Sequence, residues 1–357
     1  MLVFGWFKWK SRTVAYQERD PLPYVSVVVA MRNESEHIEL LLKNLIHQDY
    51  PSGRFEIILV NDHSTDHTLF LASQWRRDAL PAVKVIGNSQ NESGKKIALD
   101  NGIKKAKGDL IVTTDADCTM GKYWLRSMVT YHESTSSHMT LGPVIFTNYR
   151  RNATDYFQAL EFAALTGTAA GATFLNLPVY CNAANMIFNR RIYLSLQDPM
   201  VKATASGDDT LLLLNIKKRY PGKITFNRNR AALVETPPER TWSGFWNQRK
   251  RWVSKSKYYR DRDILSLSFL VYITNLFVFS LMIAGIFTPV LLNILIVAFV
   301  IKALVDLFLL LPVIFHFKKF HLLWAYIPAQ IVFPAYVTMS GLAGLSGGFH
   351  WKDRYYD

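Results

Sequence analysis

Short apolar runs alternate with stretches of helical period in the first third of the chain. The runs have the length and β-branched content of buried strands, and lie at 25–30, 55–60, 83–86 and 110–118. Amphipathic helices are expected at 36–46, after Ser64 or Asp66 as a cap, and at 94–105. Strand–helix alternation at this spacing predicts βαβ units, and therefore an α/β fold with a mostly parallel sheet.

The pattern becomes less regular after the fourth strand. It predicts a strand at 139–147, a helix at 154–170, an apolar stretch at 179–188, a helix at 205–218 and a basic, aromatic helix at 241–257. Pro237 and Pro238 end this polar-patterned part of the chain.

A long apolar region follows, with no charged residue or histidine in the 38 positions from Ile264 to Ile301. Because a membrane span needs about 20 such residues, we expect segments at 266–287, 290–313 and 322–344. We expect five units along the chain. An interfacial or disordered start at 1–23 is followed by a cytosolic domain at 24–238 and an interfacial helix at 239–263. About three membrane segments at 264–346 and a tail at 347–357 complete the chain.

The formal net charge of +13 is concentrated before the membrane region, where 239–263 holds eight Lys/Arg and three acidic residues. Positive residues hold the cytoplasmic flank of a span, so the soluble domain is expected in the cytoplasm on a bacterial-type plasma membrane. Charge that abuts a membrane segment argues against nucleic acid as a partner and for membrane lipids. Cys118 and Cys181 have no metal-site spacing and are expected to be reduced thiols.

The side of the membrane that holds the tail is not determined by hydropathy. Three crossings would place the tail outside, whereas its aromatic and basic residues suit the cytoplasmic interface. Pro328 and Pro334 would let the third segment bend back. We therefore hypothesise a re-entrant or interfacial third segment with a cytoplasmic tail.

Two aspartates end the fourth strand, in the run Asp115-Ala116-Asp117. Residues two apart project the same way from a strand, and ligands of open α/β sheets bind beyond the carboxyl ends of the strands. Mg²⁺ is often held by one or two carboxylates plus substrate phosphates. The alternative is a polar turn, and the motif alone favours that alternative.

Five motifs in order decide between these readings, because together they resemble the membrane-bound family 2 glycosyltransferases, the branch of cellulose, chitin and hyaluronan synthases and ceramide glucosyltransferases. They are Arg32-Asn33-Glu34, Asn61 to Asp66, Asp115-Ala116-Asp117, Gly207-Asp208-Asp209, and Gln248-Arg249-Lys250-Arg251-Trp252, which fits Gln-x-x-Arg-Trp. The resemblance covers about 24–260. It implies a nucleotide-binding half at 24–118 and an acceptor half at 119–238. Many relatives have Glu-Asp where this chain has Asp208-Asp209, so the identity of the base is open between the two.

The resemblance implies a role for each matching residue. Contacts to the nucleotide sugar fall to Ala30, Arg32, Glu34, Asp62, Lys95 and Asp115, with Lys96 as an alternative to Lys95. Asp117, with Asp115, would hold a divalent metal, Mg²⁺ or Mn²⁺. Asp209 is the expected catalytic base, with Asp208 as the alternative, and Gln248, Arg251 and Trp252 share one helix face. Asn182 and Asn185 would lie near the acceptor, or alternatively satisfy buried backbone.

These residues predict an inverting, metal-dependent enzyme that moves sugar from a nucleotide sugar, by default a UDP-sugar, to a lipid or lipid-linked glycan. The alternatives are a processive polysaccharide synthase and a non-catalytic membrane scaffold. A sugar-phosphate nucleotidyltransferase is disfavoured, because no Gly-rich loop follows the first strand. The sugar, the acceptor and the oligomeric state remain open.

Overall fold

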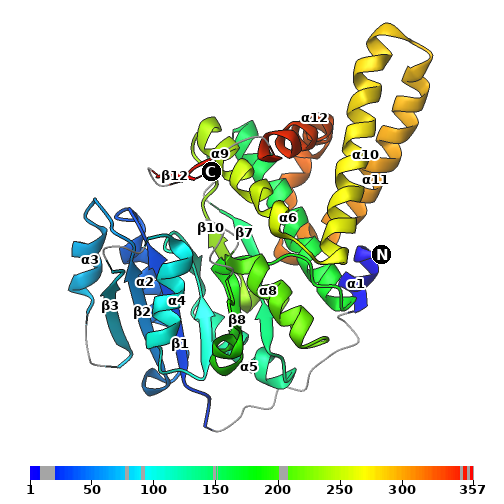
Figure 1. Ribbon diagram of the computed structural model, residues 1–357. Coiled ribbons are helices and arrows are strands. Elements are labelled where there is room, and N and C mark those ends of the chain that lie inside the picture. The colour runs from blue at the N-terminus through cyan, green and yellow to red at the C-terminus, as the bar shows by residue number, and fades with distance from the viewer. Residues whose placement is uncertain are drawn as a thin grey trace.

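The computed structural model describes residues 1–8, 21–76, 80–89, 93–147, 150, 152–200, 208–345, 349–351 and 354–356. A seven-stranded sheet in the order β3-β2-β1-β4-β8-β6-β9 forms its centre (Figure 1). These strands are β1 (Val25–Met31), β2 (Phe55–Asn61), β3 (Ala82–Gly87), β4 (Leu110–Thr113), β6 (Met139–Leu141), β8 (Met186–Asn189) and β9 (Ile224–Phe226).

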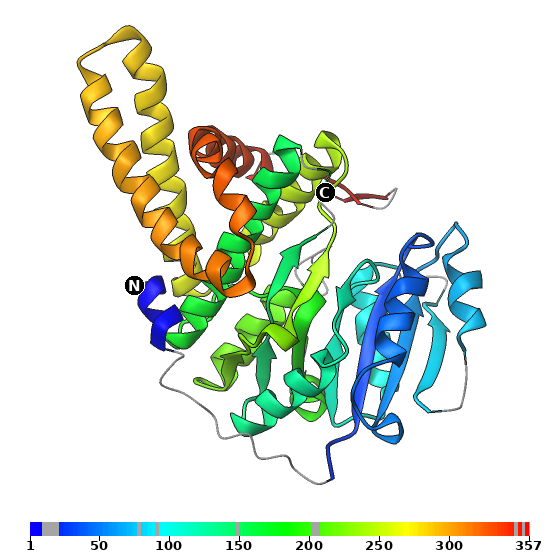
Figure 2. The same cartoon turned by 180° about the vertical axis from the view of Figure 1, so that it is seen from behind.

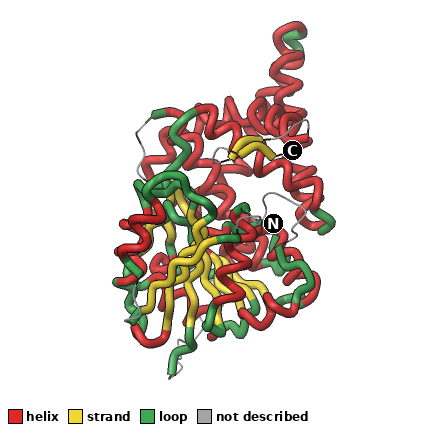
Figure 3. Tube along the Cα trace, turned by 60° about the vertical axis from the view of Figure 1, so that its left-hand side comes forward, coloured by secondary structure: helices red, strands yellow, loops and turns green. Residues whose placement is uncertain are grey.

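The first four strands are parallel, as the sequence predicts. Every residue of β2 is buried, and so is every residue of β1 except Ala30, as expected for strands covered on both faces. The sheet then changes direction, because β8 pairs antiparallel with both β4 and β6. Figure 3 shows the strands gathered on one side of the molecule and the long helices on the other.

The single strand expected at 139–147 is in fact two strands in two sheets. β7 (Val144–Phe146) joins β5 (Thr119–Met120) and β10 (Val234–Thr236) in a small sheet of order β5-β10-β7. The break falls at Gly142 and Pro143. Pro143 has no N–H to donate, and a Cβ at Gly142 would lie 2.3 Å from the Asn185 side chain. The close approach of Asn185 to the backbone at Gly142 therefore interrupts an apolar run that hydropathy alone predicts as one continuous strand.

Helices surround the sheet, and five of them lie near predicted positions. These five are α2 (Ile38–Ile46), α3 (Thr68–Gln74), α4 (Lys95–Lys105), α6 (Ala153–Phe174) and α8 (Asp208–Arg219). Two others, α5 (Trp124–Ser134) and α7 (Arg190–Ser195), were not predicted from the sequence. Short 3-10 turns are η2 (Ser52–Arg54), η3 (Ala183–Asn185) and η4 (Arg230–Ala232).

The start of the chain is an ordered helix, α1 (Leu2–Lys8), so the disordered alternative is wrong for these residues. α1 packs against α6, and its Trp6 side chain is buried. The Arg228 guanidinium lies 4.2 Å from the centre of the Trp6 ring. A tryptophan that packs on the soluble domain is not available as a membrane anchor. Residues 9–20 lie outside the described part of the chain.

Three helical segments are long and apolar enough to cross a membrane: Arg262–Phe287, Leu291–Phe317 and Phe320–Gly344. α10 (Arg262–Phe287) and α11 (Leu291–Phe317) form a hairpin that projects away from the sheet (Figures 1 and 2). The third segment is η6 (Phe320–Ala325) followed by α12 (Tyr326–Leu345). α11 continues past the expected end at 313. Pro312 lies inside this helix and does not end it.

α12 returns to the soluble domain instead of running beside the hairpin for its whole length. Its start follows η6, where the His321 ring lies 6.1 Å from the Tyr156 ring of α6. Near its end, Gly344 packs against Val253 of α9 (Trp242–Ser254). A terminal hairpin of β11 (Phe349–Trp351) and β12 (Arg354–Tyr356) also contacts α9.

Candidate active site

A cavity of about 1620 Å³ opens at the carboxyl ends of β1, β2 and β4 and extends to α9, α10, α11 and α12. Eleven of the twelve predicted site residues line it: Ala30, Arg32, Glu34, Asp62, Lys95, Asp115, Asp117, Asp209, Gln248, Arg251 and Trp252. The side chain of Asp208, the first residue of α8, lies outside the described residues. Lys96 is buried and does not line the cavity, which favours Lys95 of the two lysines.

The Asp115 and Asp117 carboxylates lie just beyond β4, on the cavity wall. Lys95 Nζ lies 2.5 Å from Asp115 Oδ1. Carboxylate oxygens are the donors that Mg²⁺ and Mn²⁺ prefer, so the residue types fit a hard cation. Among the described residues no three His, Cys, Asp or Glu side chains converge as a complete metal site. Substrate phosphates would have to supply further oxygens.

The loops after β1 and β2 are tied together below the cavity. The Arg32 guanidinium donates to the carbonyls of Asp62 and His63, at 2.8 Å each. The buried Asp62 carboxylate accepts from the Gly94 N–H and from Asn88 Nδ2, at 3.0 Å each. Gly94 has φ +114°, which favours glycine at this point. Asp62 therefore fixes the loop that carries Lys95 and also lines the cavity.

Asp209 lies in the first turn of α8 and is buried. Its Oδ1 accepts from the Thr210 N–H at 2.6 Å and from Lys255 Nζ at 3.4 Å. Burial alone would raise the pKa of Asp209, but the Lys255 ammonium, the Thr210 N–H and the Lys95 charge outweigh it, so this pKa lies below its usual value. The carboxylate is thus ionised at neutral pH, the state that a base requires.

The helix α9 carries Gln248, Arg251 and Trp252 along the cavity. Between them lies Arg249, which sequence reasoning passed over and which is 2% exposed. It forms an ion pair with Glu161 of α6 and donates to the hydroxyl of Tyr336 in α12 at 2.9 Å. Its guanidinium also lies 4.2 Å from the centre of the Trp252 ring. Arg249 therefore joins the motif helix to the soluble domain and to α12.

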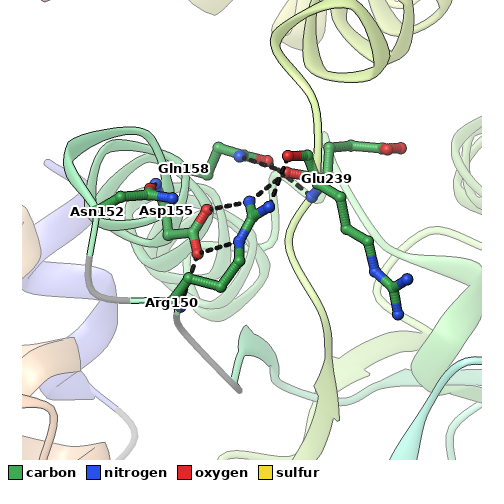
Figure 4. A network of polar contacts seen from close by, with 6 residues as sticks. Arg150, Asn152, Asp155, Gln158 and Glu239 are labelled. Carbon is green, nitrogen blue, oxygen red and sulfur yellow. Dashed lines mark hydrogen bonds and ion pairs between the residues drawn. The ribbon is translucent and has the colours of Figure 1, made fainter.

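Glu239 is a second residue that was not identified from the sequence. It connects another polar network to α9. Figure 4 shows Arg150 between the Asp155 carboxylate and the 239–240 backbone, with Nη2 donating to Asp155 Oδ1 at 2.7 Å. Gln158 exchanges two hydrogen bonds with the Glu239 backbone, each of 3.1 Å. The Glu239 carboxylate in turn accepts from Gln248 Nε2 at 3.0 Å. These contacts fix the segment around Glu239, which lines the cavity, and hold Gln248, the first residue of the Gln-x-x-Arg-Trp motif.

The comparisons with known proteins agree with this geometry. Residues 26–195 match the sequence model of the family Glycosyl transferase family 2. They form a family 2 glycosyltransferase domain. The chain is 29% identical over 248 residues to the probable glycosyltransferase YdaM of Bacillus subtilis, which covers 66% of this chain and 56% of that one. It is 36% identical over 115 residues to a beta-monoglucosyldiacylglycerol synthase of Synechocystis sp., covering 32% and 24%. The matches thus span about half or less of these relatives' length.

Among solved structures, the mannosyltransferase PcManGT of Pyrobaculum calidifontis, in complex with GDP-Man and Mn²⁺, aligns over 96% of both chains. Its TM-score is 0.54 at 17% identity, which shows a shared GT-A-like α/β fold. The glycosyltransferase domain match ends at 195, before Asp209, Gln248, Arg251 and Trp252. These four residues are joined to the domain by the cavity that they line with it.

Two asparagines of the glycosyltransferase domain differ in their surroundings. Asn185 is fully buried, accepts from Trp124 Nε1 at 3.0 Å and donates to the carbonyls of Pro143 and Ala232. It satisfies buried backbone and does not line the cavity, so the acceptor role expected from resemblance is wrong for Asn185. Asn182 does line the cavity, and its side chain caps η3.

Proposed function

We propose that this protein is an inverting, metal-dependent glycosyltransferase that moves a sugar from a nucleotide diphosphate sugar to a lipid or lipid-linked glycan. The observation that carries the proposal is the single cavity that joins the strand-end carboxylates to the membrane helices. A water-soluble donor can enter it from the domain side, and an amphiphilic acceptor can enter it from the bilayer side.

The donor would lie across the loops after β1, β2 and β4. Glu34 and Asp62 line the cavity, and their carboxylates would accept from hydroxyl or ring N–H groups of the nucleoside. Lys95 and Arg251 lie on the same cavity and are suited to diphosphate oxygens, Arg251 with a bidentate fork. A UDP-sugar is the default donor from the family resemblance.

A divalent cation bound by Asp117 and Asp115 would neutralise charge that develops on the departing diphosphate. Asp117 is the primary candidate, because Asp115 is already paired with Lys95.

Asp209 is the proposed base. It would take the proton of the acceptor hydroxyl as that oxygen attacks the anomeric carbon and the bond to the diphosphate breaks. A single displacement from the opposite face inverts the anomeric configuration. Trp252 presents an apolar ring to the cavity, the kind of surface on which a sugar packs.

The proposed acceptor is a lipid because residues of α10, α11 and α12 form one wall of the cavity. Leu267, Val278 and Phe333 are among the apolar residues of that wall. The name of the Synechocystis relative, a beta-monoglucosyldiacylglycerol synthase, supports a lipid acceptor. The basic residues before α10 favour a cytoplasmic active site on an integral membrane protein.

Mass spectrometry of the products tests this proposal. Purified protein in lipid vesicles would be incubated with UDP-glucose, UDP-N-acetylglucosamine or GDP-mannose, and the lipid and aqueous fractions analysed separately. A lipid that gains one or a few hexose masses supports the proposal. A long water-soluble polymer would favour a processive synthase instead, and no product with any donor would favour a scaffold.

A further inference from the structure

The proposed base lies beside a partly buried cation that none of the sequence motifs includes. Lys255 begins the 3-10 turn η5 (Lys255–Tyr258), directly after α9, and lines the cavity. Its Nζ lies 3.4 Å from Asp209 Oδ1, and the two side chains are only 11% and 13% exposed. The pair joins α8 to the segment that leads into the membrane helices.

The two oxygens of the Asp209 carboxylate differ in their hydrogen bonds. Oδ1 accepts from both the Thr210 N–H and Lys255. Within the described residues no hydrogen bond reaches Oδ2. A carboxylate held by one oxygen in this way presents the other oxygen in a defined direction.

We propose that Lys255 is a positioning residue, which keeps the buried Asp209 carboxylate ionised and fixes Oδ1 so that Oδ2 receives the acceptor proton. This inference rests on the proposed function, since it needs Asp209 as the base. In the reaction, Oδ2 gains the hydroxyl proton while the new C–O bond forms and the diphosphate leaves with the electron pair. Lys255 takes no part in this proton transfer.

Other charged and titratable groups around Asp209 do not replace Lys255. Lys95, on α4, also acts on Asp209, but it is paired with Asp115 at 2.5 Å. Tyr180 and Tyr259 face Asp209, and burial together with this carboxylate raises the pKa of each, so both stay neutral. Cys181 is buried nearby and is likewise no source of positive charge. Lys255 is therefore the cation within hydrogen-bond distance.

Loss of Lys255 should change the pH dependence in one direction. Without the ammonium, the largest influence that lowers the pKa of Asp209 is lost while burial still raises it, so this pKa rises. A base with a raised pKa is protonated, and so inactive, up to a higher pH. Removing Lys255 should therefore move the acid limb of the pH–rate profile upward, whereas loss of general packing would lower the rate at every pH alike.

The experiment compares kcat/KM for the acceptor between about pH 4 and 9 in vesicle-reconstituted protein, in wild type and in Lys255→Met, Lys255→Arg and Lys257→Met. Lys257 is exposed and two residues away, so its variant is the matched control. We expect the limb of Lys255→Met to rise by at least about one pH unit, a tenfold effect below the limb. Lys255→Arg and Lys257→Met should stay within about half a unit of wild type.

Equilibrium binding of a radiolabelled UDP-sugar shows whether each variant is folded. If Lys255→Met fails this control, Lys255→Gln takes its place with the same expected shift. A neutral variant that binds the donor and keeps the wild-type limb overturns the role of Lys255. If instead Asp209→Asn retains full turnover, the base assignment of the proposed function is what fails.

Discussion

At the residue scale, Asp117 is the side chain on which metal dependence rests. We expect Asp117→Asn to lower kcat for transfer at least about 100-fold, because it removes the charged oxygen ligand that holds a cation at the diphosphate. Asp117 is half-buried on the cavity wall, and its replacement by the isosteric Asn should leave folding intact, which a thermal melt in detergent checks. Undiminished transfer by wild type in the presence of a chelator would contradict the metal-dependent mechanism.

The candidate site residues at strand ends could be predicted from the sequence, whereas the residues that hold them in place could not. Asp115 and Asp117 stand out because a buried strand stops at them. Three of these holding residues contact partners that are far away in the sequence. Lys255 contacts Asp209, Arg249 contacts Glu161, and Glu239 contacts Arg150. A single sequence contains no signal for such pairings.

At the scale of elements, α9 depends on a buried junction with α6 and α12. The Tyr336 hydroxyl donates to Glu161 Oε1 at 2.6 Å and accepts from Arg249 Nε. Removing this hydroxyl leaves buried charged groups with one partner fewer, at a cost of about 1–3 kcal/mol.

We therefore expect Tyr336→Phe to lower the melting temperature in detergent by several degrees and to reduce transfer, since Gln248 and Trp252 also contact Arg249. Tyr258→Phe is the control, because Tyr258 is 44% exposed. Equal melting temperatures for the two variants would show that the junction does not stabilise α9.

The pattern of apolar and polar residues predicted the elements of the first third of the chain within two or three residues, including β1, β2, β3 and α4. It gave no prediction for α5, α7, β9 and β10. It failed at 139–147, where the cause is a long-range contact of Asn185 with Gly142. It also did not determine whether α1 is ordered. The burial of Trp6 depends on Arg228 and on α6, which both come much later in the sequence.

At the scale of the whole molecule, the contacts of α12 bear on membrane topology. Both ends of its segment lie against elements that precede the hairpin, at Tyr156 of α6 and at Val253 of α9. These contacts support the hypothesis of two full crossings, by α10 and α11, with α12 interfacial and the tail on the cytoplasmic side.

A cysteine placed at position 346 tests this topology, on a background without Cys118 and Cys181. A membrane-impermeant thiol reagent should label Ser346→Cys only after the cells are permeabilised. Thr288→Cys, in the turn between α10 and α11, should be labelled in intact cells. Labelling of Ser346→Cys in intact cells would refute an interfacial α12.

In the proposed reaction, a soluble donor and a membrane lipid meet in one cavity, and Asp209 is the base for sugar transfer between them. The most direct test follows radiolabel from a nucleotide sugar into the organic phase of vesicles that contain wild type or Asp209→Asn. We expect labelled lipid from wild type, a rate lowered about 10²–10⁴-fold in Asp209→Asn, and donor affinity equal within twofold. Label that stays in the aqueous phase with wild type, or equal lipid labelling by both proteins, would contradict the account.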